Sequence, residues 1–212
     1  MDRLIGRRSS LYTRTVLIFS ATLGIPCEFE PVRDLGTTDP RRYGGNPALK
    51  LPVLHGRNGE LFGALNICRA LADRADEEAS PERGPRIIWP EELRHDLCRN
   101  AQELVADGMT AQVQLVMSTL VGNVAPHEHF VIKTRSGLEG SLHWLDANLG
   151  EVLQVIPEPR VLSWFEVSLF CLVEHLTFRL TVPMHDYTAL VRFARAYAER
   201  PAIRGTSYQF DP

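Results

Sequence analysis

The chain has 212 residues, of which 44% are hydrophobic and 23% charged, and its formal net charge is -3 at pH 7. This composition is typical of a soluble globular protein that buries a substantial core, and the length suits two small domains. The slightly acidic charge gives no electrostatic reason to expect nucleic acid or an anionic membrane as a partner.

Cysteine spacing and the apolar segments indicate the compartment. The four cysteines are widely spaced and form neither a Cys-x-x-Cys pair nor a zinc-binding pattern, so we expect a reducing, cytoplasmic location and no metal site. The start of the chain lacks the pattern of a signal peptide. Glu166 and Glu174 interrupt the apolar run 161–180, so we expect no membrane span.

The first 74 residues predict an α/β unit. The expected elements are a strand at 4–5, a helix at 11–23, a strand at 27–32, strands at 51–55 and 60–62, and a helix at 64–74. Gly24 suits a left-handed cap at the end of the first helix. A strand, a helix and a strand of these lengths form a right-handed crossover with parallel strands, and the next two strands form an antiparallel hairpin.

The remaining chain is predicted to be helical. Polar and helix-breaking residues favour a linker over 75–90, which separates a domain at 1–74 from an all-helical domain at 91–212. The periodicity predicts helices over 91–117, 141–155 and 187–200. We expect Gly108 to bend the first of them.

Ser163-Trp164-Phe165-Glu166 has the spacing of a capping box before the apolar run 167–173. In such a box the serine hydroxyl accepts from the amide three residues on, and the glutamate returns to the serine amide. This predicts a helix that starts at Ser163 and is stabilised by about 0.5 to 2 kcal/mol.

The order of elements over 4–71, together with the run Asn46-Pro47-Ala48-Leu49-Lys50-Leu51-Pro52-Val53-Leu54, resembles the thioredoxin-like half of the glutathione transferase family. The capping box, with Glu166 in place of the family's Asp, and the ending Glu199-Arg200-Pro201-Ala202 are similar to the family's helical half. The resemblance implies a thioredoxin-like α/β N-terminal domain followed by an all-α helical C-terminal domain, and a homodimer.

The resemblance also implies a glutathione site around Pro52. The matching proline of the family has a cis peptide bond, through which Leu51 would offer its backbone N–H and C=O to the cysteinyl part of glutathione. Lys50 would pair with the glycyl carboxylate. The alternatives are a trans proline at a strand edge and a solvated lysine.

Ser10 matches the catalytic hydroxyl of the serine-type members, at the start of the first helix. A free thiol has a pKa of about 8.5, and a hydroxyl donor and the positive end of a helix both favour the thiolate. Ser9 is an equally good helix cap and stays a second candidate. In a purely structural interpretation, both serines only cap the helix.

Gly63-Ala64 departs from the family pattern, which has an acidic residue followed by Ser or Thr for the γ-glutamyl group. The predicted function is a glutathione S-transferase-like enzyme that activates the thiol of glutathione for attack on a small hydrophobic electrophile. The alternative is a non-catalytic binding module that has lost the γ-glutamyl site. The electrophile is expected near Gln102, Val105, Ala106 and Met109.

Overall fold

The computed structural model describes residues 2–78 and 86–211, which form two compact units. One unit comprises Met1–Pro85 together with Glu199–Pro212, and the other comprises Arg86–Ala198. The last part of the predicted helical domain at 91–212 therefore belongs to the N-terminal unit. The predicted linker at 75–90 is helical as far as Glu78 and contains a short strand, while 79–85 lies outside the described residues.

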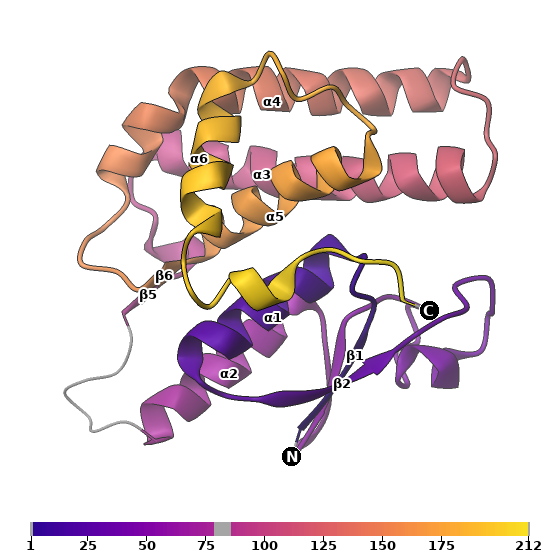
Figure 1. Cartoon of the computed structure of the whole chain (residues 1–212), viewed down its shortest axis with the longest axis vertical. Coiled ribbons are helices and arrows are strands. Elements are labelled where there is room, and N and C mark those ends of the chain that lie inside the picture. Colours follow the sequence, from indigo (N-terminus) through magenta and orange to yellow (C-terminus); the bar gives the residue numbers. More distant parts are fainter. Residues whose placement is uncertain (1, 79–85, 212) are drawn as a thin grey trace. The chain divides into compact units, whose positions relative to one another are not determined.

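The N-terminal unit contains a four-stranded sheet in the order β2-β1-β3-β4 (Figure 1). The strands are β1 (Asp2–Gly6), β2 (Cys27–Pro31), β3 (Val53–Gly56) and β4 (Gly59–Phe62). β1 and β2 are parallel, whereas β1 with β3 and β3 with β4 are antiparallel. The predicted parallel pairing of the first two strands and the predicted antiparallel hairpin are therefore confirmed.

Two helices, α1 (Leu11–Leu23) and α2 (Ala64–Glu78), pack against each other beside the sheet. α1 has the predicted bounds and ends at Gly24, whose φ of 71° is the left-handed conformation that glycine adopts without steric cost. The apolar face of α1 supplies Leu11, Ile18 and Phe19 to the core, each with no exposed surface.

A second apolar cluster joins β1 and β3 to the segment that connects β2 with β3. Ile5, Val32 and Val53 form its buried centre, and Leu51 packs against it. Gly44 follows a short 3-10 helix, η1 (Pro40–Tyr43), and has a φ of 63°. A Cβ at Gly44 would lie 2.7 Å from Ile5 Cδ1, so this glycine allows the connection to approach the sheet closely.

The other unit is mainly helical. Its elements are β5 (Ile87–Ile88), η2 (Pro90–Glu92), α3 (Asp96–Leu115), the π-helix η3 (Val116–Val121), α4 (His129–Val155), β6 (Leu162–Ser163), α5 (Trp164–Arg179) and α6 (Thr188–Ala198). The two short strands pair in parallel. The three predicted helices are confirmed, although α3 begins at Asp96 and α4 begins twelve residues before 141.

Gly108 lies inside α3 and has a packing role. α3 is continuous over Asp96–Leu115, and a Cβ at Gly108 would lie 2.9 Å from Leu172 Cδ2 on α5. By length and composition alone, Asp96–Val121 is long and apolar enough to cross a membrane, a test that core helices of soluble proteins also pass. In this unit α3 packs against α4 and α5.

The predicted capping box at Ser163 is wrong, although α5 does begin at the next residue. The Ser163 side chain makes no capping hydrogen bond, and within the described residues its buried Oγ has no partner. Glu166 Oε2 instead accepts from Arg160 Nε at 2.7 Å. A buried carboxylate gains more from a guanidinium than from one backbone amide, so the ion pair displaces the local motif.

Candidate functional site

Strand register brings three predicted segments to the same end of the strands, which we call the sheet edge: the turn before α1, the Leu51-Pro52 peptide and the start of α2. Ile5 pairs with Val53, and Val53 pairs with Phe62, so β1 and β4 end where β3 begins. The turn before α1, the Leu51-Pro52 peptide and the start of α2 therefore lie at the same edge. The amide of Gly63 donates to Pro52 O at 3.3 Å, which joins the second and third segments directly.

Helices α1 and α2 both begin at this edge. The first backbone N–H groups of a helix have no partner within the helix, and they carry the positive end of its dipole. Two helix N-termini therefore direct N–H groups toward this edge, where an anionic ligand would be stabilised.

Ser10 is the N-cap of α1. Its Oγ accepts from the amide of Thr13 at 3.3 Å, and its own amide donates to Arg7 O at 3.0 Å. Because the hydroxyl oxygen acts as the acceptor in the cap, the O–H proton remains available for a ligand. Ser10 is half-buried, whereas Ser9 is 3% exposed, so the accessible hydroxyl of the pair is that of Ser10.

Thr13 holds this turn from the inside and was missed by the sequence analysis. Its side chain has no exposed surface, and Oγ1 accepts from the amide of Arg7 at 3.4 Å. A Cβ at Gly6 would lie 2.7 Å from Thr13 Oγ1, so glycine is the residue that lets the strand end pass this side chain. A small polar residue three positions after an N-cap is common, so the sequence alone did not mark Thr13 as a residue of the site.

The Leu51-Pro52 peptide bond is cis, as the resemblance implied. The side chain of Leu51 packs against the cluster of Ile5 and Val53, which fixes the residue beside the sheet. Among residues 2–78 and 86–211, no hydrogen bond reaches the N–H or the C=O of Leu51. Both groups are therefore available to pair with an extended peptide ligand.

Asn46 positions the segment before the cis proline. It is 5% exposed, its Nδ2 donates to Lys50 O at 2.8 Å, and its Oδ1 accepts from the amide of Ala48 at 3.0 Å. The Lys50 side chain is exposed. The sequence analysis did not select Asn46, although Asn before Pro is a turn signal that could have identified it.

Gly63 and Ala64 form the turn into α2 without acidic or hydroxyl side chains. Gly63 has a φ of 85°, and a Cβ there would meet nothing within 4 Å, so backbone conformation favours glycine at this position. Asn66 Nδ2 donates to Phe62 O at 3.1 Å and closes the first turn. The first amides of α2 are the groups that this segment offers to a carboxylate.

Glu60 does not replace the missing acidic residue. Its Oε1 lies 4.0 Å from His55 Nε2, and a Cβ at Gly45 would lie 3.2 Å from its carboxyl carbon. His55 also contacts Gly44 O through Nε2 at 2.9 Å and Arg3 through Nδ1 at 3.0 Å. The Glu60 carboxylate therefore belongs to the contacts around His55.

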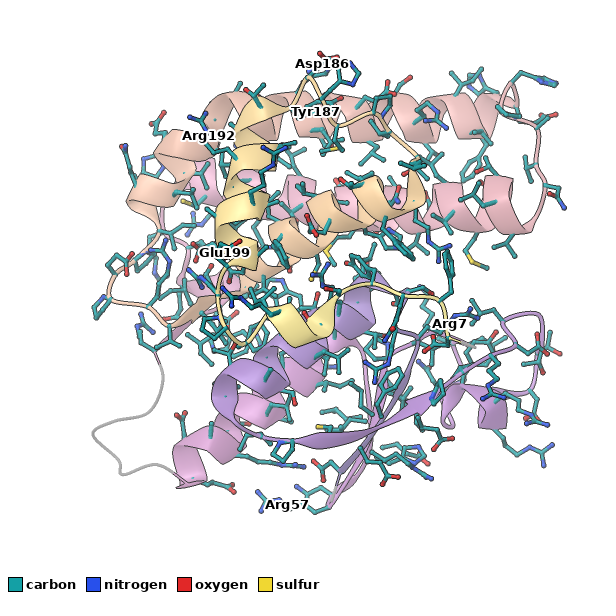
Figure 2. All side chains as sticks on the ribbon, in the orientation of Figure 1. Arg7, Arg57, Asp186, Tyr187, Arg192 and Glu199 are labelled. Atoms are coloured by element: carbon teal, nitrogen blue, oxygen red, sulfur yellow. The ribbon has the colours of Figure 1, made fainter. Side chains whose placement is uncertain are left out.

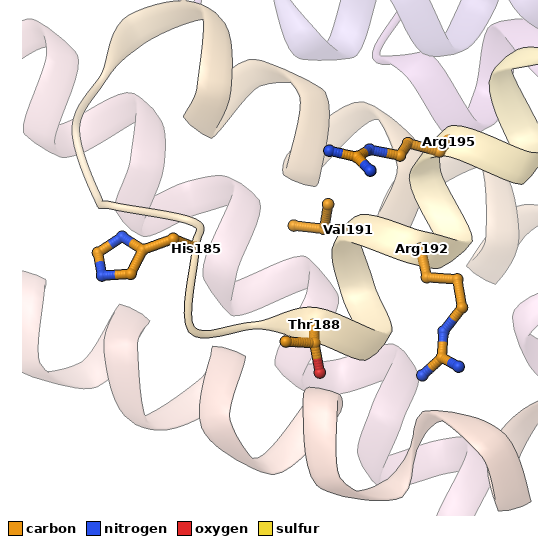
Figure 3. Close-up of a pocket in the computed structure, with 5 residues that line it drawn as sticks. All are labelled: His185, Thr188, Val191, Arg192 and Arg195. Carbon is orange, nitrogen blue, oxygen red and sulfur yellow. The ribbon is translucent and has the colours of Figure 1, made fainter.

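The residues expected to meet the electrophile lie on α3. Val105 and Met109 are 0% and 2% exposed, whereas Ala106 is exposed. The expected position of the electrophile stays a prediction. A different hollow, of about 690 Å³, lies beside α6. The five side chains that line it are labelled in Figure 3. Its lining residues are His185, Thr188, Val191, Arg192 and Arg195, none of which the sequence analysis selected.

No family model and no curated protein matches the chain. Several solved structures do match the chain in fold. A glutathione S-transferase from Methylobacillus flagellatus KT with glutathione bound has a TM-score of 0.74 at 18% identity, covering 99% of this chain and 100% of that chain. One from Methylobacterium radiotolerans JCM 2831, in complex with glutathione sulfonate, has a TM-score of 0.73 at 22% identity, covering 100% and 97%.

A plant protein shares the same architecture. Glutathione transferase F7 from Populus trichocarpa has a TM-score of 0.69 at 16% identity and covers 97% of both chains. All three similarities extend over nearly the whole chain and include both compact units. The chain therefore has the glutathione transferase fold, with a thioredoxin-like α/β part followed by a helical part.

Proposed function

We propose that this chain binds glutathione at the sheet edge formed by the Ser10 turn, Leu51-Pro52 and the start of α2, and activates its thiol for attack on a small hydrophobic electrophile. The observation that carries the proposal is the half-buried Ser10 hydroxyl at the N-cap of α1, on the same edge as the cis Leu51-Pro52 bond. Structures of this fold from Methylobacillus and Methylobacterium hold glutathione and glutathione sulfonate, which supports the choice of ligand.

The proposed chemistry is stabilisation of a thiolate. The Ser10 Oγ accepts from the Thr13 amide, so its proton is free to donate to the sulfur of the ligand. The N-terminus of α1 adds a positive potential at the same place. The thiolate is the nucleophile, and each unit by which its pKa falls corresponds to about 1.4 kcal/mol of differential stabilisation.

Backbone groups supply the peptide contacts in this proposal. The N–H and C=O of Leu51 pair with the cysteinyl residue of glutathione, in the manner of a strand added to a sheet edge. Lys50, whose side chain is exposed, pairs with the glycyl carboxylate. The first amides of α2 receive the γ-glutamyl carboxylate.

The second candidate is a binding module without catalysis. Gly63-Ala64 favours it, since this turn offers no counter-charge to the γ-glutamyl amine and no hydroxyl donor. The loss corresponds to about 1 to 3 kcal/mol of binding, or roughly fivefold to 150-fold in affinity. The two candidates differ in whether the thiol of bound glutathione is activated.

Calorimetric titration with glutathione tests the binding step. We expect saturable binding at millimolar or better affinity by the wild-type protein. Ser10→Thr keeps both the cap and the hydroxyl and serves as the matched control for Ser10→Ala, which removes both. If no heat change and no thermal shift occur up to several millimolar glutathione, the proposal is wrong.

Turnover with a panel of hydrophobic electrophiles then separates the two candidates. The enzyme candidate expects Ser10→Ala to lose turnover while Ser10→Thr retains most of it. Binding without turnover in the wild-type protein would favour the non-catalytic module. Equal turnover by Ser10→Ala and Ser10→Thr would instead remove Ser10 from the mechanism. A circular dichroism spectrum like that of the wild-type protein shows that each variant is folded.

We also propose a cytoplasmic homodimer. Large apolar side chains that are at least 38% exposed cluster along 117–132 of the helical unit: Met117, Leu120, Val121, Val124, Phe130 and Ile132. Exposed apolar groups in such number favour burial against another chain. Sedimentation equilibrium checks this, since a dimer sediments at twice the chain mass of 23.9 kDa and a monomer at that mass.

A further inference from the structure

The start of α2 presents unpaired backbone donors at the sheet edge. Among the described residues, the amides of Ala64, Leu65 and Asn66 donate no hydrogen bond. The Ile67 amide makes the first bond of the helix, to Gly63 O at 3.1 Å. Free N–H groups at the positive end of a helix stabilise a carboxylate and disfavour a cation. This end of the site therefore prefers an anionic group.

The acidic side chains nearest to this turn in the chain do not reach it. The Glu60 carboxylate contacts His55, and the next acidic residue is Asp73. Asp73 follows Ala64 by nine residues, which is about 13 Å along the helix. Farther along α2, Glu77 pairs with Arg57 in the turn between β3 and β4. Figure 2 shows Arg57 at the far end of the N-terminal unit from Arg7, which precedes the Ser10 turn.

Other acidic residues of the N-terminal unit lie on or beside β2. Glu28 and Glu30 are on β2, which is three strands away from β4, or about 14 Å. Asp211 Oδ2 accepts from the amide of Arg8 at 3.0 Å, and the Arg8 guanidinium lies over the ring of Phe29 on β2. The Asp211 carboxylate therefore lies on the side of the sheet edge that is remote from α2.

Three further carboxylates have local partners. Asp2 pairs with Arg74 at the start of β1, which is the opposite end of that strand from the sheet edge. Asp34 accepts from the amide of Gly36 at 2.7 Å, and Asp39 pairs with Arg41 at 2.8 Å. Within the described part of the N-terminal unit, none of the carboxylates named here is placed to pair with a cation at the start of α2.

The charged side chains in the segments that form the sheet edge are basic. Arg7 and Arg8 are half-buried in the turn before Ser10, and Lys50 is exposed just before the cis bond. The N-termini of α1 and α2 add positive potential. An ammonium group held at the start of α2 would therefore meet a positive potential.

We infer that the thiol ligand of this site carries a carboxylate and no free amine at the end that meets α2, and that Gly63 sets this preference. The inference rests on the proposed function, which places the γ-glutamyl end of glutathione there. Glutathione has an ammonium group beside that carboxylate. A thiol peptide whose amine is absent or acylated keeps the carboxylate and avoids the unpaired charge, so this is the ligand class that the site selects.

Glutaryl-Cys-Gly, which is glutathione with the amine replaced by hydrogen, tests the preference directly. Wild-type protein is titrated with this peptide and with glutathione by calorimetry, under reducing conditions near neutral pH. We expect glutaryl-Cys-Gly to bind about twofold to fivefold more tightly, the factor that one unit charge near a helix end produces. Glutathione binding with equal or higher affinity would overturn the inference, since it would require a carboxylate that pairs with the amine.

Gly63→Glu supplies the missing carboxylate. A Cβ at Gly63 would meet nothing within 4 Å, so the side chain has room. Gly63→Gln is the matched control, because it has nearly the same size and the same backbone cost at a φ of 85°. The ratio of the two ligand affinities is taken within each protein, which cancels that cost.

The two variants should differ in this ratio. In Gly63→Glu we expect glutathione to gain about tenfold relative to glutaryl-Cys-Gly, the size of a hydrogen bond between charged groups. Gly63→Gln should keep the preference of the wild-type protein. An equal ratio in the two variants would overturn the assignment of Gly63 as the residue that sets the preference.

The wild-type titrations also separate this inference from the proposed function. If glutaryl-Cys-Gly binds and glutathione does not, the inference stands and glutathione is not the ligand, so the proposed function fails. If both bind and glutathione binds more tightly, the binding step of the proposed function stands and the inference is wrong. If neither binds up to several millimolar, both are wrong.

Discussion

Asn46 is predicted to hold the segment that presents Leu51 and Pro52. Its two hydrogen bonds, to Lys50 O at 2.8 Å and from the Ala48 amide at 3.0 Å, are lost in Asn46→Ala. Each contributes about 0.5 to 1.5 kcal/mol, and the unpaired groups left behind add a desolvation cost. We therefore expect the free energy of unfolding to fall by about 2 to 3 kcal/mol.

A loss of this size is easily measured. For a chain of about this length it lowers the midpoint of thermal unfolding by about 4 to 12 °C. Loosening of the segment should also weaken glutathione binding by about tenfold, because the Leu51 backbone is no longer held in position before the ligand arrives. Differential scanning calorimetry measures the unfolding midpoint, and calorimetric titration measures the glutathione affinity, of the same Asn46→Ala protein.

Two further variants sharpen this test. Asn46→Asp keeps the acceptor for the Ala48 amide but loses the donor to Lys50 O, so its stability should lie between those of the wild-type protein and Asn46→Ala. Asn100→Ala removes an exposed asparagine from α3 and should change stability by less than about 0.5 kcal/mol. If Asn46→Ala unfolds at the wild-type temperature and binds glutathione equally well, the positioning role is refuted.

Three more substitutions test the packing. Glu166→Ala removes the buried partner of Arg160, whose side chain is 11% exposed and whose remaining carboxylate partner is the exposed Glu158, and should cost about 2 kcal/mol in urea unfolding. A loss below about 1 kcal/mol would contradict the ion-pair account. Gly108→Ala should destabilise by about 1 to 3 kcal/mol because its Cβ would lie 2.9 Å from Leu172 Cδ2, whereas helix propensity alone predicts a gain. Gly63→Ala should cost about 1 to 2 kcal/mol from its φ of 85°, and an unchanged midpoint would show that the turn tolerates alanine.

The N-terminal unit was predictable because its signals are local. The apolar periodicity of α1 and the Gly24 cap fixed that helix to the residue, and the alternation of β3 and β4 around Gly59 indicated the hairpin. The cis Leu51-Pro52 bond came from the family resemblance alone, since the sequence around a proline does not determine its isomer.

Long-range contacts account for what the sequence did not reveal. Ser163 and Glu166 have the spacing of a capping box, but Arg160 takes the carboxylate, and a local motif cannot anticipate a buried ion pair. Thr13 and Asn46 are buried polar residues whose importance appears only once their backbone partners are in place. The end of the chain from Glu199 groups with the N-terminal unit, and Asp211 and Tyr208 contact Arg8 and Arg14, which lie about 200 residues earlier in the sequence, so no local pattern could anticipate these contacts.

The most direct test of the central claim is the pKa of the glutathione thiol when it is bound to this protein. It is measured from the ultraviolet absorbance of the thiolate as the pH is raised, with the wild-type protein, Ser10→Thr and Ser10→Ala compared. The account predicts a pKa clearly below the free value of about 8.5 in the first two proteins and a return toward it in Ser10→Ala. An unshifted pKa in the wild-type protein, or the same shift in all three, would contradict the assignment of Ser10 as the residue that activates the thiol.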